Sequence, residues 1–264
     1  MLRKLIKYDL KANYLYLMVG YVVYIVLTLG FVASIRWMDR SMAVSQEEGT
    51  LQWITMASST FLWVAAIIGV VLMTYILLIR RFYCHLVTDQ GYLTLTLPVS
   101  TRQHVLSKLI SAVIFIVATA CVLLAGVVVA GAGLRGEGFM TDFLQVLGDV
   151  FRQLGTSFSI LAGIGGILNL LQAILLIYFS ICIGQLCNKH KIWGSIGAYL
   201  GISFAINLLV TIMGMVFGVM GNGGLLYLYT ENFYGVLYDL FLLALCLVYF
   251  FGSAWLLEKR TNLE

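Results

Sequence analysis

The sequence predicts an all-α membrane protein with six transmembrane helices. Of its 264 residues, 61% are hydrophobic and only 11% are charged, and the mean hydropathy is +0.98. This is more apolar surface than one soluble core of this length can bury. Charge-free runs of more than about 18 residues recur along the chain, and a run of that length can cross a bilayer as a helix. A transmembrane β-barrel would instead show short segments of alternating polarity.

The apolar runs place the six spans. In chain order we expect them at about 14–35, 54–79, 109–134, 159–186, 194–218 and 236–257. Two charge-free intervals, 153–188 and 192–230, are longer than one crossing of roughly 30 Å requires. Each is therefore expected to hold one helix plus interfacial residues. The six spans together predict a single transmembrane domain over residues 1–264.

Residues 1–13 have a pattern of their own ahead of the first span. Their apolar and basic side chains separate onto different helix faces, with Leu2, Leu5, Ile6 and Leu10 on one and Lys4, Lys7 and Lys11 on another. The alternative is a plain basic flank. The apolar spacing is more regular than a flank requires, so it favours an amphipathic helix lying in the membrane interface.

Charge sets the expected orientation. With six spans both termini share a face, and that face carries 12 of the 16 basic residues but only 4 of the 12 acidic ones. Because Lys and Arg are enriched in cytoplasmic loops, we expect both termini in the cytoplasm. The net charge of +4 is then a consequence of topology, so it does not predict nucleic acid as a partner.

Two segments outside the spans are expected on the face opposite the termini. Residues 139–154 repeat apolar side chains at helical spacing among charges, which predicts an amphipathic helix outside the spans. Residues 221–231 begin with the sequence Gly-Asn-Gly-Gly and fit either a re-entrant element or an ordinary glycine loop.

The chain shows no catalytic pattern. It has no GxxxxGK[ST] sequence for binding ATP, its three histidines lack HExxH spacing, and its five cysteines lack metal-site spacing. The cysteines are expected to be reduced thiols. Asp239, near the outer end of the last span, is the only carboxylate that could act at membrane depth. We therefore expect a non-catalytic chain that binds no metal or cofactor of its own.

Uncharged polar residues occur inside two spans. Asn169 and Gln172 share a face of the fourth span, and Asn207 and Thr211 share a face of the fifth with Ser203. They are candidates for lining a translocation path. They could equally form hydrogen bonds between helices, each worth about 0.6–2 kcal/mol, and this second interpretation is favoured.

The long polar interruption at residues 80–108 holds the only proline, Pro98. Proline cannot continue a helix, and Ser100 or Thr101 supplies an N-cap for the helix that enters the third span. Apolar Tyr92 and Leu95 remain on a segment at the membrane surface. Such side chains indicate a docking surface or a self-packed turn.

Two motifs resemble a known family. The loop sequence Asp89-x-Gly91-Tyr92-Leu93-x-Leu95-Thr96-Leu97-Pro98-Val99-Ser100 is similar to the cytoplasmic loop of ABC-2 type transporter permeases of Gram-positive bacteria. The opening Leu5-x-Lys7-Tyr8-Asp9-Leu10-Lys11 is similar to their N-terminus. Six spans and the chain length match as well, although this sequence carries no large outer domain.

The resemblance implies a membrane subunit that takes its energy from a separate protein. A cytoplasmic coupling helix between spans two and three would dock on an ATP-binding cassette ATPase, which binds the ATP and magnesium. The residues implied in docking are Asp89, Gly91, Tyr92, Leu93, Leu95, Pro98, Ser100 and Arg102, with a shorter contact at residues 188–191.

The resemblance also implies a second permease chain, the same or homologous, and export of a peptide, drug or lipid-like substrate across the bacterial plasma membrane. Two alternatives are a stand-alone channel or secondary carrier and, least favoured, an intramembrane enzyme that uses Asp239.

Overall fold

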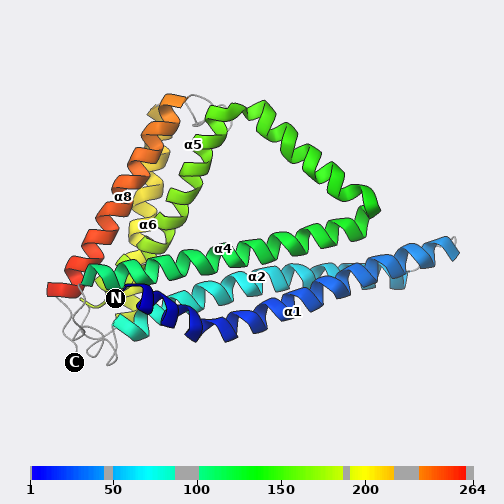
Figure 1. Ribbon diagram of the computed structural model, residues 1–264, viewed down its shortest axis with the longest axis horizontal. Helices are drawn as coiled ribbons and strands as arrows, with labels where there is room; N and C mark the ends of the chain where they lie inside the picture. Colours follow the sequence, from blue (N-terminus) through cyan, green and yellow to red (C-terminus); the bar gives the residue numbers. More distant parts are fainter. Residues whose placement is uncertain (1, 45–49, 87–100, 187–190, 217–231, 260–264) are drawn as a thin grey trace. The chain divides into compact units, whose positions relative to one another are not determined.

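The computed structural model describes residues 2–44, 50–86, 101–186, 191–216 and 232–259. Within these ranges the chain forms six α-helices and one short 3-10 helix, with no strand (Figure 1). The elements are α1 (Leu2–Val44), α2 (Thr50–Leu86), α4 (Thr101–Arg135), η1 (Gly136–Gly138), α5 (Phe139–Gly184), α6 (Lys191–Val216) and α8 (Asn232–Lys259). The all-α prediction is confirmed for the described residues.

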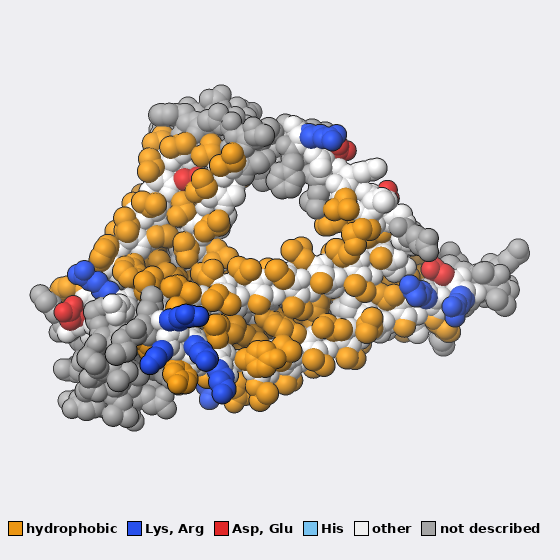
Figure 2. Space-filling view, in the orientation of Figure 1, with side chains coloured by type: hydrophobic (Ala, Val, Ile, Leu, Met, Phe, Trp, Pro, Cys, Tyr) orange, Lys and Arg blue, Asp and Glu red, His pale blue; other side chains and the backbone are white. Residues whose placement is uncertain are grey.

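Each α-helix contains one segment that is long and apolar enough to cross a membrane. The segments are Arg3–Arg40, Trp53–Cys84, Thr101–Leu134, Ile160–Gly184, Lys191–Met215 and Gly235–Glu258. Hydrophobic side chains cover the helices on the visible face, and most Lys and Arg side chains gather toward helix ends (Figure 2). Large apolar side chains such as Phe61, Trp193 and Phe204 are more than 70% exposed. Exposed apolar surface on this scale is typical of a multi-pass membrane protein.

The helices are longer than the predicted spans. At 1.5 Å per residue, the 43 residues of α1 extend roughly 65 Å, about twice the hydrocarbon thickness. The described helices contain no proline, because Pro98 lies outside them. No backbone breaker therefore ends a helix at the membrane surface.

This continuity changes two expected elements. Residues 2–13 are helical and run directly into the first span as part of α1; whether they lie in the membrane interface stays a prediction. Residues 139–154 are also helical, but they form the start of the 46-residue α5 and not a separate element. The two ring systems at this start, Phe139 and Phe143, stack with their centroids 5.9 Å apart.

One compact unit consists of Lys7–Leu78 and Ile114–Asp149. In it α1, α2 and α4 lie side by side around a core of Phe31, Ile35 and Ala130. The rings of Phe31 and Trp63 stack with their centroids 5.0 Å apart, and Trp63 Nε1 donates a hydrogen bond to Thr28 Oγ1 over 3.2 Å. The indole thus ties α2 to α1 by both its face and its N–H.

Hydrogen bonds between polar side chains also join α1, α2 and α4. The Thr119 hydroxyl of α4 lies 2.8 Å from the Tyr21 hydroxyl of α1 and 3.1 Å from the Thr74 hydroxyl of α2. The fully buried Tyr24 donates to the carbonyl oxygen of Leu123 over 3.1 Å. Neutral hydrogen bonds of this kind hold helices together where lipid provides no hydrophobic force between them.

The second compact unit consists of Met1–Ile6, Ile79–Val113 and Val150–Glu264. Its described part contains most of α5, all of α6 and α8, the last turns of α2 and the first turns of α4. Its most buried apolar side chains include Phe82, Val105, Cys182 and Leu257. The single transmembrane domain over residues 1–264 stays a prediction.

Close approach of α5 and α6 depends on glycine at one position in this unit. A Cβ atom at Gly184 would lie 2.6 Å from the backbone nitrogen of Ser195 and 2.8 Å from the carbonyl oxygen of Lys191. These are backbone atoms, so no side-chain movement could relieve the overlap. The end of α5 and the start of α6 are therefore in direct backbone contact.

Candidate functional site

Most of the residues implied in docking lie outside the described ranges. Asp89, Gly91, Tyr92, Leu93, Leu95, Pro98 and Ser100 all fall in residues 87–100. The expected re-entrant element and residues 188–190 of the shorter contact lie outside them as well. The structure does describe what holds the two ends of the 87–100 segment, namely the last turns of α2 and the first turns of α4. We call these turns, residues 79–86 and 101–113, the loop anchors.

A single tyrosine contacts both loop anchors. The ring of Tyr178, in α5, stacks on the ring of Phe82, in α2, with centroids 4.0 Å apart and an angle of 9° between the planes. The Tyr178 hydroxyl donates to the carbonyl oxygen of Lys108, in α4, over 3.4 Å. Phe82 is fully buried and Tyr178 is 2% exposed. Tyr178 therefore joins the two helices that carry the 87–100 segment to α5.

The α4 anchor buries a stripe of polar residues. His104, Ser107, Lys108 and Ser111 are all less than 9% exposed, and they recur at i, i+3, i+4 and i+7. The Ser107 hydroxyl donates to the His104 carbonyl oxygen and the Ser111 hydroxyl to the Ser107 carbonyl oxygen, each over 2.9 Å. Serines that return their hydrogen bond to their own helix behave as small residues and allow neighbouring helices to approach.

This burial corrects one expectation from the sequence. The polar interruption at residues 80–108 was expected to sit in water, but His104 and Lys108 within it are enclosed by protein in α4. Their helical spacing places the four polar residues on one face, but it does not say whether that face meets water or other helices. The burial depends on tertiary contacts such as that between Tyr178 and Lys108.

Arg102 is the one docking candidate that the structure describes. Its guanidinium carbon lies 5.6 Å from the centroid of the Phe251 ring in α8, a distance at which a cation and an aromatic face attract. Both side chains are exposed. The contact ties the start of α4 to α8, and it leaves the docking role of Arg102 a prediction.

One candidate for path lining in α5 contacts a neighbouring helix. Asn169 Nδ2 donates to Gly165 of its own helix over 2.9 Å, and Asn169 Oδ1 accepts a hydrogen bond from the Tyr238 hydroxyl of α8 over 3.4 Å. This contact supports the interpretation of Asn169 as a residue that holds helices together, and the role of Gln172 stays a prediction.

The candidates in α6 have a different setting. Asn207 is exposed and donates to the Ser203 carbonyl oxygen of its own helix over 2.8 Å, while Thr211 is half-buried. Asn207 thus presents an amide on the surface of a membrane-spanning helix. Such a position is costly in lipid unless protein or water covers it.

Reactive groups do not gather in the part of the chain that the structure describes. No group of three or more His, Cys, Asp or Glu side chains there could hold a metal ion. Four described cysteines, Cys84, Cys121, Cys182 and Cys246, are free thiols. Asp239 is 7% exposed, so protein encloses it within its compact unit. Several of the polar residues described above contact neighbouring helices, and they do not form a cluster of reactive groups in the described ranges.

Comparison of the chain with models of protein families, with curated proteins and with solved structures finds no match.

Proposed function

We propose that this chain is the membrane-spanning permease subunit of an ATP-binding cassette transporter, driven through residues 87–100 by a separate ATPase subunit. The observation that best supports this proposal is the position of Tyr178, which contacts both helices that carry the segment. A segment that receives force needs a rigid connection to the helices that it moves.

The loop anchors supply one such connection in the buried stack of Phe82 on Tyr178, which leads to α5. Closely packed side chains transmit a displacement because the packed interior is not readily compressed. A push on the segment would therefore displace α5 together with the ends of α2 and α4. The exposed Arg102–Phe251 contact adds a weaker link to α8.

The chemistry in this proposal belongs to the partner. The ATPase subunit binds ATP and magnesium, and its different affinities for ATP in two conformations bias the permease between two states. This chain contributes the path and the mechanical connection. Its cytoplasmic termini, its place in a bacterial plasma membrane and its export of a peptide, drug or lipid-like substrate follow from the charge pattern and the family resemblance.

A second permease chain would cover α6. None of the most apolar segment of α6 is buried against the described chain. Gly197 and Gly201 form a GxxxG pair with nothing within 4 Å of the position of a Cβ atom. A GxxxG pair allows two helices to approach closely in a membrane. The exposed amide of Asn207 on the same helix would find hydrogen-bond partners in such an interface.

The experiment that tests this proposal joins capture with transport. The chain, with a photo-crosslinking amino acid in place of Tyr92, is co-expressed with a candidate ATP-binding cassette ATPase, and the pair is reconstituted in liposomes. We expect the crosslink to capture the ATPase and transport to require ATP hydrolysis. Leu95→Asp should abolish both results, and Tyr92→Asp, tested without the crosslinker, should abolish transport. Met140→Asp, which adds the same charge at an exposed position that the expected topology puts on the other side of the membrane, should preserve both results.

Two results would contradict the proposal. One is solute transport by the purified chain alone without nucleotide, which would instead support a channel or secondary carrier. The other is a crosslinker at position 92 that never captures an ATPase in the cells that naturally make this chain.

A further inference from the structure

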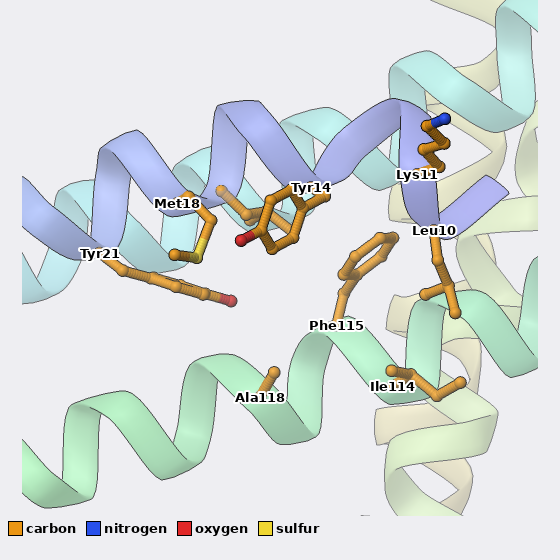
Figure 3. Close-up of a pocket in the computed structure, with 9 residues that line it drawn as sticks. Leu10, Lys11, Tyr14, Met18, Tyr21, Ile114, Phe115 and Ala118 are labelled. Carbon is orange, nitrogen blue, oxygen red and sulfur yellow. The ribbon is translucent and has the colours of Figure 1, made fainter. Parts of the chain in front are cut away.

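A groove of about 470 Å³ lies between α1 and α4 within one compact unit (Figure 3). Its lining is almost entirely apolar and includes Leu10, Tyr14, Phe115 and Ala118. The volume lies within the range of roughly 300–1,000 Å³ that is typical of sites for small organic ligands. The groove therefore has room for a ligand with a long apolar part.

The groove has the depth of one membrane leaflet. Its lining runs along α1 from Leu10 and Lys11 to Tyr21, and ten helical residues rise about 15 Å. This is half of the hydrocarbon thickness of about 30 Å. If the first span begins near residue 14, as the sequence predicts, Lys11 lies at the membrane surface and the groove runs from there toward the bilayer centre.

Hydroxyl groups in contact with one another lie at the end of the groove that is farther from Lys11. The Tyr21 hydroxyl lies 2.8 Å from the Thr119 hydroxyl, which in turn lies 3.1 Å from Thr74 of α2. These hydroxyls satisfy one another where lipid offers no hydrogen bonds. An apolar chain that entered from the surface would end at this contact.

The shallow end carries positive charge. The Lys11 stem lines the groove, and Figure 3 shows its ammonium group pointing away from Ile114 and Ala118. Lys7 lies one helical turn before Lys11, and both side chains are exposed. Lysines that bury their stems in apolar surface and hold their charge at the interface are placed to meet anionic headgroups.

We propose that this groove is a binding site for an anionic phospholipid of the leaflet next to the N-terminus. One acyl chain lies along Tyr14, Phe115 and Ala118, and the headgroup phosphate meets the ammonium groups of Lys7 and Lys11. The combination of leaflet depth, a closed inner end and two cations at the mouth matches a phospholipid better than a soluble ligand. The site does not depend on the function proposed above.

The first test measures headgroup selectivity. The full chain in detergent is titrated with phosphatidylglycerol or phosphatidylcholine of the same acyl chains, and bound lipid is counted by native mass spectrometry. Replacing both lysines, Lys7→Gln with Lys11→Gln, should weaken phosphatidylglycerol binding about 30-fold, or about fivefold for each lysine, and leave phosphatidylcholine binding unchanged. Arg40→Gln, at the other end of the same helix, is the matched control and should change neither. Equal losses from Arg40→Gln and the lysine pair would overturn the proposal.

The second test locates the acyl chain. Phosphatidylglycerol with a photoreactive group in its acyl chain should label Tyr14–Tyr21 and Ile114–Ala118 preferentially. Ala118→Phe fills the groove and should reduce this labelling about tenfold. Ala120→Phe, two residues further on the exposed surface of the same helix, should not. The lysine variants keep the site testable even if Ala118→Phe does not fold.

Two outcomes of the labelling would refute the site. Labelling spread evenly over the exposed apolar helices would show only the ordinary lipid that surrounds any membrane protein. An unlabelled groove, together with crosslinks from its residues to another copy of the chain, would show that a second copy occupies it.

Discussion

The rings of Phe82 and Tyr178 stack with their centroids 4.0 Å apart, and this contact joins the end of α2 to α5. Tyr178 also reaches Lys108 of α4 through its hydroxyl. Two helix ends that are separated along the chain by residues 87–100 are thereby fixed to the same side chain. Any movement of that segment that displaces one loop anchor must strain or shift Tyr178.

Removing the Phe82 ring should destabilise this unit strongly. Phe82→Ala deletes a fully buried ring and leaves a cavity against Tyr178, so we expect the free energy of unfolding to fall by about 3 kcal/mol. Thermal unfolding in detergent measures the effect. Phe61→Ala removes the same ring from a 73% exposed position of the same helix and should cost much less. Equal losses from both variants would show that the stack contributes nothing specific.

Asn169 and Tyr238 should behave as an interacting pair. If the amide holds α5 to α8, then Asn169→Leu and Tyr238→Phe should each cost about 0.6–2 kcal/mol, and the double variant should cost less than the sum. A double-mutant cycle on the unfolding free energy measures the coupling. Transport by the variants should stay close to that of the parent chain. Loss of transport with unchanged stability would instead assign Asn169 to the translocation path.

The hydroxyl contacts of Thr119 predict a further loss of stability. Thr119→Val keeps the shape of the side chain but removes its contacts with Tyr21 and Thr74, and it should cost about 1–2 kcal/mol. Thr60→Val is the control, because Thr60 is exposed and its hydroxyl donates only within its own helix. A hydrogen-exchange measurement should show faster exchange in α1 and α4 for the first variant and no change there for the second.

Gly184 should tolerate no side chain. Gly184→Ala places a methyl group against the backbone of Ser195 and Lys191, so α5 and α6 must separate at their junction. We expect a loss of about 1–3 kcal/mol. Gly163→Ala, in the same helix with nothing within 4 Å, should be neutral or stabilise by up to about 1 kcal/mol because alanine favours helix. The difference between the two unfolding free energies tests the contact.

The six spans could be predicted from the sequence because continuous apolar runs depend on composition alone. The helix ends could not. Apart from Pro98 the chain has no proline, so no proline marks where α1 or α5 stops, and both extend well past the bilayer thickness. Local sequence gives the existence of these helices better than their length.

The candidate site was predictable only in part. The start of α4 at Thr101 agrees with the cap expected near Ser100 and Thr101. The Phe82–Tyr178 stack joins residues far apart in the chain, and no local sequence pattern predicts such a contact. The spacing of His104 and Lys108 places them on one helix face, but only tertiary packing buries that face.

The backbone contact at Gly184 has a mechanical consequence. Gly184 lies fewer than two helical turns after Tyr178 in α5, and the start of α6 leaves no gap into which α5 could slide. We therefore expect α5 and α6 to move together, with the Phe82–Tyr178 stack near the centre of their rotation. If two copies of the chain meet along α6, a rotation that begins at Tyr178 would widen or narrow the interface between them.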